Sequence, residues 1–345
     1  NPDNPIEGQV WYNKTDNVAK YEIPNVLTSW RTSVNINTAR ATGAGAGIAP
    51  AALIFGGKAP PSGAIKTQTE SWNGSSWTEV NDLNTAKAYT AGAGTYTSAI
   101  NMSGVSNPSN APLVNAETWN GSSWTEVNDL NTGRGTSGNA GADSTSALAF
   151  GGFIGPPPSS RSAATESWNG SSWTEVNDLN TARSGLGGVG TATAALAYGG
   201  YSTAVRGDTE SWNGSSWTEV NNLNTSRDDG GSSGNYTAAL FFGGPSSSPY
   251  LTKTESWDGT SWTETGDLST GRYSPQSTSG TGNTSALAAG GYASPGYVTA
   301  TEEFTANAPV GAWTTGTDMN VTHTNGGGTD VGSAESSMVF GGEAG

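Results

Sequence analysis

The chain of 345 residues contains no cysteine and a single histidine. The absence of cysteine excludes disulfide bonds, thiolate metal sites and a cysteine nucleophile. One histidine cannot supply the set of imidazole ligands on which most transition-metal sites depend. The cellular compartment stays open, because a secreted protein with a large enough core can fold without disulfides.

Positive charge is also scarce. Lys and Arg number 14 against 29 Asp and Glu, which gives a formal net charge of −15. This balance argues against binding to nucleic acid or to anionic membrane surfaces. No apolar run approaches the ~20 residues of a membrane span, so we expect no membrane insertion. The sequence shows neither an initiator Met nor a signal peptide, and we expect a processed product or part of a longer chain.

What the sequence does contain is a repeat. The phrase SWNGSSWTEV occupies 71–80 and recurs at 167–176 and 211–220, with TWNGSSWTEV at 118–127 and SWDGTSWTET at 256–265. A fixed period of this size is typical of propellers and solenoids. Together with 13 Trp, the repeat argues against disorder despite 50 Gly.

Each repeated phrase predicts a β-hairpin. Asn73-Gly74 favours a two-residue type I′ turn, and the flanking Thr, Trp and Val suit strands. This register places Trp72 opposite Ser75 and Glu70 opposite Trp77, and it puts both Trp side chains on one bulky face. We therefore predict that the second Trp of each hairpin packs between neighbouring repeats. These residues are Trp77, Trp124, Trp173, Trp217, Trp262 and Trp313.

Four strands are expected in each repeat, including an apolar strand that ends in Gly-Gly, as in AALIFGG at 51–57. Counting by these Gly pairs or by the final Trp gives seven repeats. The pattern TSWRTSVNINTAR resembles SSWTEVNDLNTAK and predicts that 29–34 form the last strand of a repeat whose beginning is missing. We predict that residues 1–34 complete the blade begun by 320–345, which removes exposed strand edges. In this division, 1–36 is the segment that completes the last blade and 37–345 holds the repeats of one domain. Strands are also expected on both sides of a turn at 14–17.

An Arg, a small strand, an apolar strand ending in Gly-Gly and a Trp-closed hairpin together resemble the kelch repeat. The resemblance implies an all-β fold, a seven-bladed β-propeller with four antiparallel strands per blade. The near-identical SWNGSSWTEVNDLNTAR units and the opening NPDNPIEGQVWYN also resemble repeat proteins of marine tailed bacteriophages, including fibre-like and other virion proteins. That second resemblance implies a virion or extracellular setting.

Two kinds of enzyme share such propellers, and neither fits. The copper-radical oxidases need a Cys–Tyr pair and histidine ligands, which this chain lacks. The sialidase-like propellers carry an Asp-box, but here Asn73 or Asp258 directly precedes Gly, so the spacing fails by one residue. His323 occupies a position that is basic in every repeat, and we interpret it as structural. We expect no catalytic residue, no metal and no cofactor.

The acidic and basic residues recur in step. The Glu positions are Glu70, Glu117, Glu166, Glu210, Glu255 and Glu302, and the basic positions are Arg40, Lys87, Arg134, Arg183, Arg227, Arg272 and His323. A catalytic acid is normally unique, so recurrence favours a structural ion pair in every blade. The alternative is a cationic ring open to anions. The Asn-Asp-Leu-Asn turns could suggest calcium, but side-chain caps of a tight connection account for them.

The loops that follow the Gly pairs differ from blade to blade and should share one face of the propeller. A uniform scaffold with varied loops is how binding surfaces are built. The candidate ligand-binding residues are Phe153, Arg161, Tyr201, Arg206, Tyr250, Lys253 and Tyr292. We expect a non-enzymatic module that presents this face to a host-surface glycan, acidic ones included, or to a neighbouring virion protein. A homo-oligomer is compatible with this role. The alternatives are a purely structural fibre or shell subunit and, behind it, a carbohydrate-active enzyme.

Overall fold

The computed structural model describes residues 28–306, except 107–108, 156–159, 246–248, 279 and 281, together with six short strands nearer the two ends. The chain divides into two compact units: Ser29–Ala306, and Asn1–Thr28 with Asn307–Gly345. Among the described residues, no helix has the length and apolar character needed to cross a bilayer.

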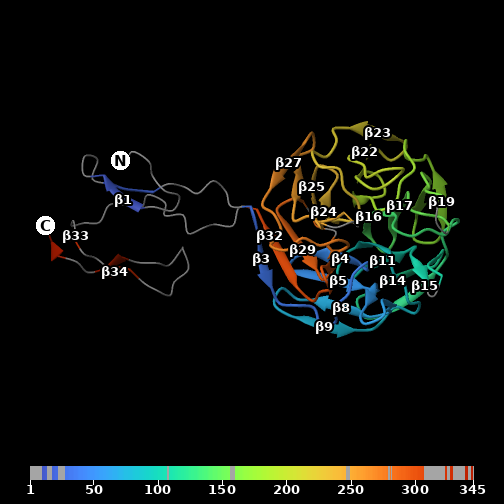
Figure 1. Cartoon of the computed structure of the whole chain (residues 1–345), viewed down its shortest axis with the longest axis horizontal. Helices are drawn as coiled ribbons and strands as arrows, with labels where there is room; N and C mark the ends of the chain where they lie inside the picture. The colour runs from blue at the N-terminus through green and yellow to red at the C-terminus, as the bar shows by residue number, and fades with distance from the viewer. Residues whose placement is uncertain are drawn as a thin grey trace. The chain divides into compact units, whose positions relative to one another are not determined.

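The unit Ser29–Ala306 is a β-propeller whose four-stranded antiparallel sheets are arranged around a central axis (Figure 1). The blades are numbered along the chain, and blade 1 contains β4 (Ala44–Ile48), β5 (Ala51–Phe55), β8 (Thr69–Trp72) and β9 (Trp77–Val80). Blade 2 contains β10 (Ala91–Gly94), β11 (Ala99–Met102), β14 (Ala116–Trp119) and β15 (Trp124–Val127). Blade 3 contains β16 (Gly138–Asp143), β17 (Ser146–Phe150), β18 (Thr165–Trp168) and β19 (Trp173–Val176). Blade 4 contains β20 (Gly187–Gly190), β21 (Ala195–Tyr198), β22 (Thr209–Trp212) and β23 (Trp217–Val220). Blade 5 contains β24 (Gly231–Asn235), β25 (Ala238–Phe242), β26 (Thr254–Trp257) and β27 (Trp262–Thr265). Blade 6 contains β28 (Gln276–Ser277), β29 (Ser285–Ala289), β32 (Thr301–Thr305) and β3 (Ser29–Ser33).

The all-β propeller with four-stranded blades is confirmed, but the prediction of seven blades is wrong, because the ring closes with six. Its last blade takes three strands from 276–305 and its outermost strand from β3, which pairs with β32 at Trp30↔Phe304 (Figure 1). Residues 29–33 are therefore the end of a repeat whose beginning lies elsewhere in the chain, as expected. The beginning lies at 276–305, however, and the predicted junction of 1–34 with 320–345 is not how the ring closes.

Backbone hydrogen bonds pass from each blade to the next and return to the first. The second residue of each Gly pair donates its N–H to the carbonyl of the buried base in the following blade, ending with Gly291 to Arg40 at 2.8 Å. A second cycle joins the residues that lie two positions after each base. It begins where Tyr89 donates its N–H to the Thr42 carbonyl at 2.6 Å. It closes where Thr42 donates its N–H to the Ser274 carbonyl at 3.2 Å. Both cycles contain six steps, so the ring is complete without a seventh blade.

The close approach of neighbouring blades in the first of these cycles explains why glycine occurs at the Gly pairs. A Cβ added to Gly151 lies 2.7 Å from the Arg183 carbonyl oxygen, and the residue has φ of +64°. A side chain at this position meets the neighbouring backbone, so the approach of one blade to the next favours glycine.

The hairpins differ from the predicted two-residue turn. Trp72 pairs directly with Trp77, and Glu70 pairs with Glu79, so the loop contains the four residues 73–76. The Asn73 side-chain oxygen accepts hydrogen bonds from the N–H groups of Ser75 and Ser76, both at 2.9 Å, which stabilises this longer turn. The shift is of two residues, so the predicted bulky face with both Trp side chains is nevertheless correct.

The second Trp of each hairpin is buried between blades, as predicted. Trp124, for example, packs edge-on against Phe55 of blade 1 at 4.8 Å between ring centroids and donates its indole N–H to Thr69 of that blade at 3.1 Å. Trp77, Trp124, Trp173, Trp217 and Trp262 are each at most 7% exposed. Trp313 lies outside the described residues, and Trp30 of β3 occupies the corresponding place in blade 6.

In the other unit, β1 (Val10–Asn13) pairs antiparallel with β2 (Val18–Tyr21), which confirms the strands expected around 14–17. Two further pairs join β33 (His323–Thr324) to β36 (Glu343–Ala344) and β34 (Gly327–Gly328) to β35 (Val339–Phe340). The side chain of His323 lies outside the described residues.

Candidate functional site: the loop face and the channel mouth

The recurring Glu and basic residues form buried ion pairs, one in each blade. The pairs are Arg40–Glu70 (2.9 Å), Lys87–Glu117 (3.4 Å), Arg134–Glu166 (2.5 Å), Arg183–Glu210 (3.1 Å), Arg227–Glu255 (3.0 Å) and Arg272–Glu302 (2.5 Å). Every side chain in this set is at most 2% exposed. The structural prediction is confirmed for these six blades, and the alternative of a cationic ring open to anions is wrong because none of the six described bases faces solvent.

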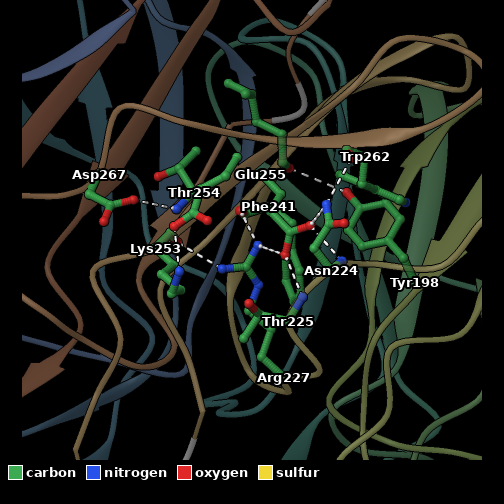
Figure 2. A network of polar contacts seen from close by, with 12 residues as sticks. Tyr198, Asn224, Thr225, Arg227, Phe241, Lys253, Thr254, Glu255, Trp262 and Asp267 are labelled. Carbon is green, nitrogen blue, oxygen red and sulfur yellow. Dashed lines mark hydrogen bonds and ion pairs between the residues drawn. The ribbon is translucent and has the colours of Figure 1, made fainter.

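Blade 5 shows how such a pair is held (Figure 2). The Glu255 carboxylate accepts hydrogen bonds from the N–H groups of Asn224 and Thr225 at 2.7 and 3.1 Å, in addition to Arg227. Burial lowers the pKa of Arg227 to about 10, and the adjacent Glu255 opposes that shift. The acid and the base thus hold the connection between the blades against the sheet of blade 5.

Two kinds of connection reach one face of the propeller, which we call the loop face. They are the loops after the Gly pairs and the segments that lead from one blade into the next. Short antiparallel bridges join them within a blade, as between Gly135 and Phe153, Ser184 and Tyr201, or Tyr273 and Tyr292. The predicted sharing of one face is therefore confirmed. The hairpin turns and the turns between the first two strands lie at the opposite face.

A channel of about 120 Å³ runs along the axis, lined mostly by Gly, Ala, Ser and Thr of the innermost strands. Its mouth on the loop face is formed by the second hydrogen-bond cycle. The residues of this mouth ring are Thr42, Tyr89, Thr136, Gly185, Asp229 and Ser274. All six adopt left-handed φ values between 45° and 65°. Because the bonds of the cycle use only the backbone, the side chains at these positions are free to differ.

Beside the mouth lies a tyrosine cluster from blades 5 and 6, made up of Tyr250, Tyr273, Tyr292 and Tyr297. The ring centroids of Tyr273 and Tyr292 are 5.5 Å apart, and Tyr250 lies 5.3 Å from Tyr273. Tyr297 meets Tyr292 edge-on at 5.2 Å. Burial, more than any neighbouring charge, raises the pKa of Tyr273 and of Tyr297. Tyr273 and Tyr297 therefore stay neutral hydroxyl donors across the physiological range.

Lys58 and Tyr89 add a polar group from blades 1 and 2. The Lys58 ammonium lies 4.6 Å from the centre of the Tyr89 ring and donates a hydrogen bond to the Asn110 side-chain oxygen at 3.0 Å. Partial burial lowers the pKa of Lys58. Burial also raises the pKa of Tyr89 to about 12, with Asp229 as the next contribution.

Asp229 is the carboxylate of the mouth ring. It stands three steps from Tyr89 in the six-membered cycle, so the two residues lie across the channel mouth from each other. Burial and then the neighbouring Asp228 raise the pKa of Asp229 to about 7. A Cβ added to Gly185 lies 2.8 Å from the Asp229 Oδ1 atom, so the glycine leaves the space that this carboxylate occupies.

Of the residues predicted to bind ligand, Tyr250 and Tyr292 belong to the tyrosine cluster. Arg161 and Tyr201 also lie together on the loop face, where the guanidinium stacks on the ring at 4.5 Å. Phe153 packs against the apolar cluster of Ile65, Ala88 and Val105, which joins blades 1 and 2.

The two remaining predicted cations are paired with acids. Arg206 donates to the Asp208 carboxylate, with Nε 2.7 Å from Oδ2, and Lys253 forms an ion pair with Glu264 of β27. Lys253 lies just before β26, where its carbonyl accepts a hydrogen bond from Arg227 (Figure 2). The reason for expecting an acidic ligand at these two residues is therefore lost.

The sequence reasoning missed Lys58, Tyr89, Asp229 and Tyr273. Apart from Lys58, these residues follow the buried base by one or two positions, just before the small strand that the sequence predicts after each Arg. A signal was present, because the position two after the base is Thr, Tyr, Thr, Gly, Asp and Ser in successive blades. A position that varies inside a near-identical repeat indicates a site that packing does not dictate.

Comparison with known proteins supports the fold alone. No protein-family model matches the chain, and no curated protein matches its sequence. Among solved structures, the chain is similar to the one described as the structure of YjhT, with a TM-score of 0.63 and 14% sequence identity. The likeness covers 78% of this chain and 95% of that one. At this identity it shows a shared β-propeller architecture.

Proposed function

We propose that this propeller is a non-enzymatic binding module whose loop face binds carbohydrate. The observation that carries the proposal is the tyrosine cluster, in which residues from two blades gather half-buried rings beside the channel mouth. Tyr combines a large apolar face with a hydroxyl and loses little conformational entropy on binding. Such rings suit the alternating C–H and hydroxyl groups of a sugar.

The uses of the other polar groups support a binding role over a catalytic one. The six recurring Glu residues are held in buried structural pairs. The described residues contain no group of three or more His, Asp and Glu that could hold a metal ion. Hydrolysis of a glycosidic bond ordinarily needs two carboxylates flanking the bond. In the described part of the loop face, the candidate carboxylates at the channel mouth are the sequence neighbours Asp229 and Asp228.

We also propose a setting for this module. The repeats are of the kelch type, and the chain is a virion protein of a tailed bacteriophage that presents the loop face to a glycan on the host surface. Support comes from the repeat phrase and from the opening NPDNPIEGQVWYN. A subunit that only builds a fibre or shell is the outcome to expect if no glycan binds.

A glycan array probed with the whole chain tests the proposal. We expect binding to a defined set of glycans and a loss of at least about tenfold in the double variant Tyr250→Ala, Tyr292→Ala. The matched control is Tyr236→Ala, because Tyr236 is 46% exposed and lies in a turn of the opposite face. Full binding by the double variant, or equal loss in the control, would contradict a site on the loop face.

A further inference from the structure

The mouth ring brings a set of polar side chains to one opening. Its residues occupy equivalent places around the axis, because each follows the buried base of its blade by two positions and joins the same backbone cycle. Five of the six carry a hydroxyl or carboxyl group, and all of them line the axial channel. Only Gly185 contributes no side chain.

Two buried hydroxyls of the channel have no hydrogen-bond partner among the described residues. Thr42 Oγ1 belongs to the mouth ring, Thr278 Oγ1 belongs to the innermost chain of blade 6, and the two residues are 4% and 1% exposed. Burying a hydroxyl without a hydrogen-bond partner lowers the stability of the fold. Both residues line the channel, so the described protein leaves two polar oxygens there without a hydrogen-bond partner.

Asp229 lines the same space. None of the ion pairs in the described part of the chain includes it. The groups around it are Asp228, the hydroxyl-bearing rings of Tyr89 and Tyr273, and the bare backbone of Gly185. An anion entering the mouth meets the repulsion of two adjacent acids, whereas a cation meets attraction.

The kind of cation follows from the donor set. A calcium ion takes six to eight oxygen ligands, generally with several carboxylates. Here Asp229 is the single carboxylate of the ring, accompanied by hydroxyls and by Tyr rings. An alkylammonium group matches this set, because it donates three hydrogen bonds and is attracted to aromatic faces.

We propose that the channel mouth binds the ammonium group of its ligand between Asp229 and the hydroxyls of the mouth ring. This inference rests on the proposed carbohydrate function and narrows it: the glycan carries free primary amines, as in a glucosamine polymer, with its sugar rings on the tyrosine cluster. The Asp229 carboxylate accepts hydrogen bonds from the ammonium group. Thr42 and Ser274, from the two blades that follow Asp229 in the ring, accept further hydrogen bonds through their hydroxyl oxygens.

Titration calorimetry with the whole chain tests this at pH 7, where the amines of the probe and the carboxyl group of Asp229 are both partly charged. The probes are a glucosamine tetrasaccharide, the fully N-acetylated tetrasaccharide and ethylammonium chloride. We expect the free amine form to bind at least tenfold more tightly than the acetylated form, and Asp229→Asn to abolish that preference. Thr278→Val should weaken binding of the amine form severalfold without lowering the melting temperature.

The matched control is Asp143→Asn, which makes the same change of charge on the opposite face. Asp143 accepts hydrogen bonds from Thr145 in its turn, and Asn235 fills the equivalent place in blade 5, so the substitution has a natural precedent. Equal binding of both tetrasaccharides overturns the inference and leaves the carbohydrate function standing. Ethylammonium binding that depends on Asp229, without tetrasaccharide binding, supports the ammonium site and overturns the carbohydrate function. No binding of any probe overturns both.

Discussion

The residues of the mouth ring combine a fixed backbone with a free choice of side chain. Five of them are not glycine, and the left-handed conformation costs such residues about 1–2 kcal/mol each. Each one gains an inter-blade hydrogen bond of 2.6 to 3.2 Å that only this conformation brings into place. The conformation recurs in every blade, so its purpose is structural. The identity of the side chain, by contrast, is left open for function.

Asp229 should make stability depend on pH. Its raised pKa of about 7 means that the folded protein binds this proton more tightly than the unfolded chain does. Stability therefore falls as the pH rises from about 4 to about 7 and is constant above that. We expect Asp229→Asn to melt with the parent at pH 4 and above it at pH 8. Asp143→Asn should show no such gain, because hydrogen bonds from Thr145 lower the pKa of Asp143. Parallel melting curves for the parent and Asp229→Asn at both pH values would contradict the assignment.

The Trp residues between blades should dominate stability. Trp173 is 7% exposed and donates its indole N–H to the Asn128 carbonyl at 3.1 Å. Replacing a buried Trp with Ala typically costs about 3–5 kcal/mol, and we expect that loss for Trp173→Ala in denaturant unfolding, with a smaller loss for Trp173→Phe. Unchanged stability combined with lost glycan binding would identify Trp173 as a ligand platform instead.

At the scale of the element, two glutamates that face each other across neighbouring strands of a blade differ in burial. Glu166 of β18 and Glu175 of β19 are direct cross-strand partners, but Glu166 is buried against Arg134 and Glu175 is exposed. Removing one partner of a buried ion pair costs about 3–5 kcal/mol, because the other charge is left without compensation.

These two Glu residues provide an internal comparison. We expect Glu166→Gln to lower the free energy of unfolding by roughly 3–5 kcal/mol, and Glu175→Gln to change it by less than about 0.5 kcal/mol. Adding Arg134→Met to Glu166→Gln should restore part of the loss, since the uncompensated charge is then gone. If Glu175→Gln proved as damaging as Glu166→Gln, burial against Arg134 would not be the cause of the loss.

Much of the blade could be predicted from the sequence, because alternation and recurrence are local. The face shared by Trp72 and Trp77 and the pairing of Glu70 with Arg40 both follow from spacing within one repeat. The turn was misjudged because Asn73 can serve a two-residue or a four-residue loop. The observed choice lets the two Trp rings pack 5.2 Å apart. The variable position two after the base indicated a site, but the channel mouth itself could not be predicted, since Tyr89 and Asp229 come to lie across it only after closure of the whole ring.

At the scale of the whole molecule, the number of blades depends on which segment completes the last sheet. Trp30 and Trp313 both follow a repeat-like pattern, so counting either motif gives seven. The structure gives the outer edge of blade 6 to Trp30, which packs against Phe242 of blade 5 at 4.6 Å and donates its indole N–H to Thr254 at 2.9 Å. The recurring Glu residue occurs six times in the sequence, and this count equals the number of blades.

The closing strand offers the most direct test of this account, because six blades require β3 to lie beside β32. Ser29 and Thr305 are cross-strand partners, and antiparallel partners have Cα atoms about 4.5–5.5 Å apart, within reach of a disulfide. The chain has no cysteine of its own, so Ser29→Cys with Thr305→Cys introduces a single possible bond. We predict that the oxidised double variant cross-links within one chain, migrates faster on a denaturing gel and melts higher than its reduced form, while neither single variant does so. Failure to cross-link under oxidising conditions in the folded protein would contradict the six-bladed ring.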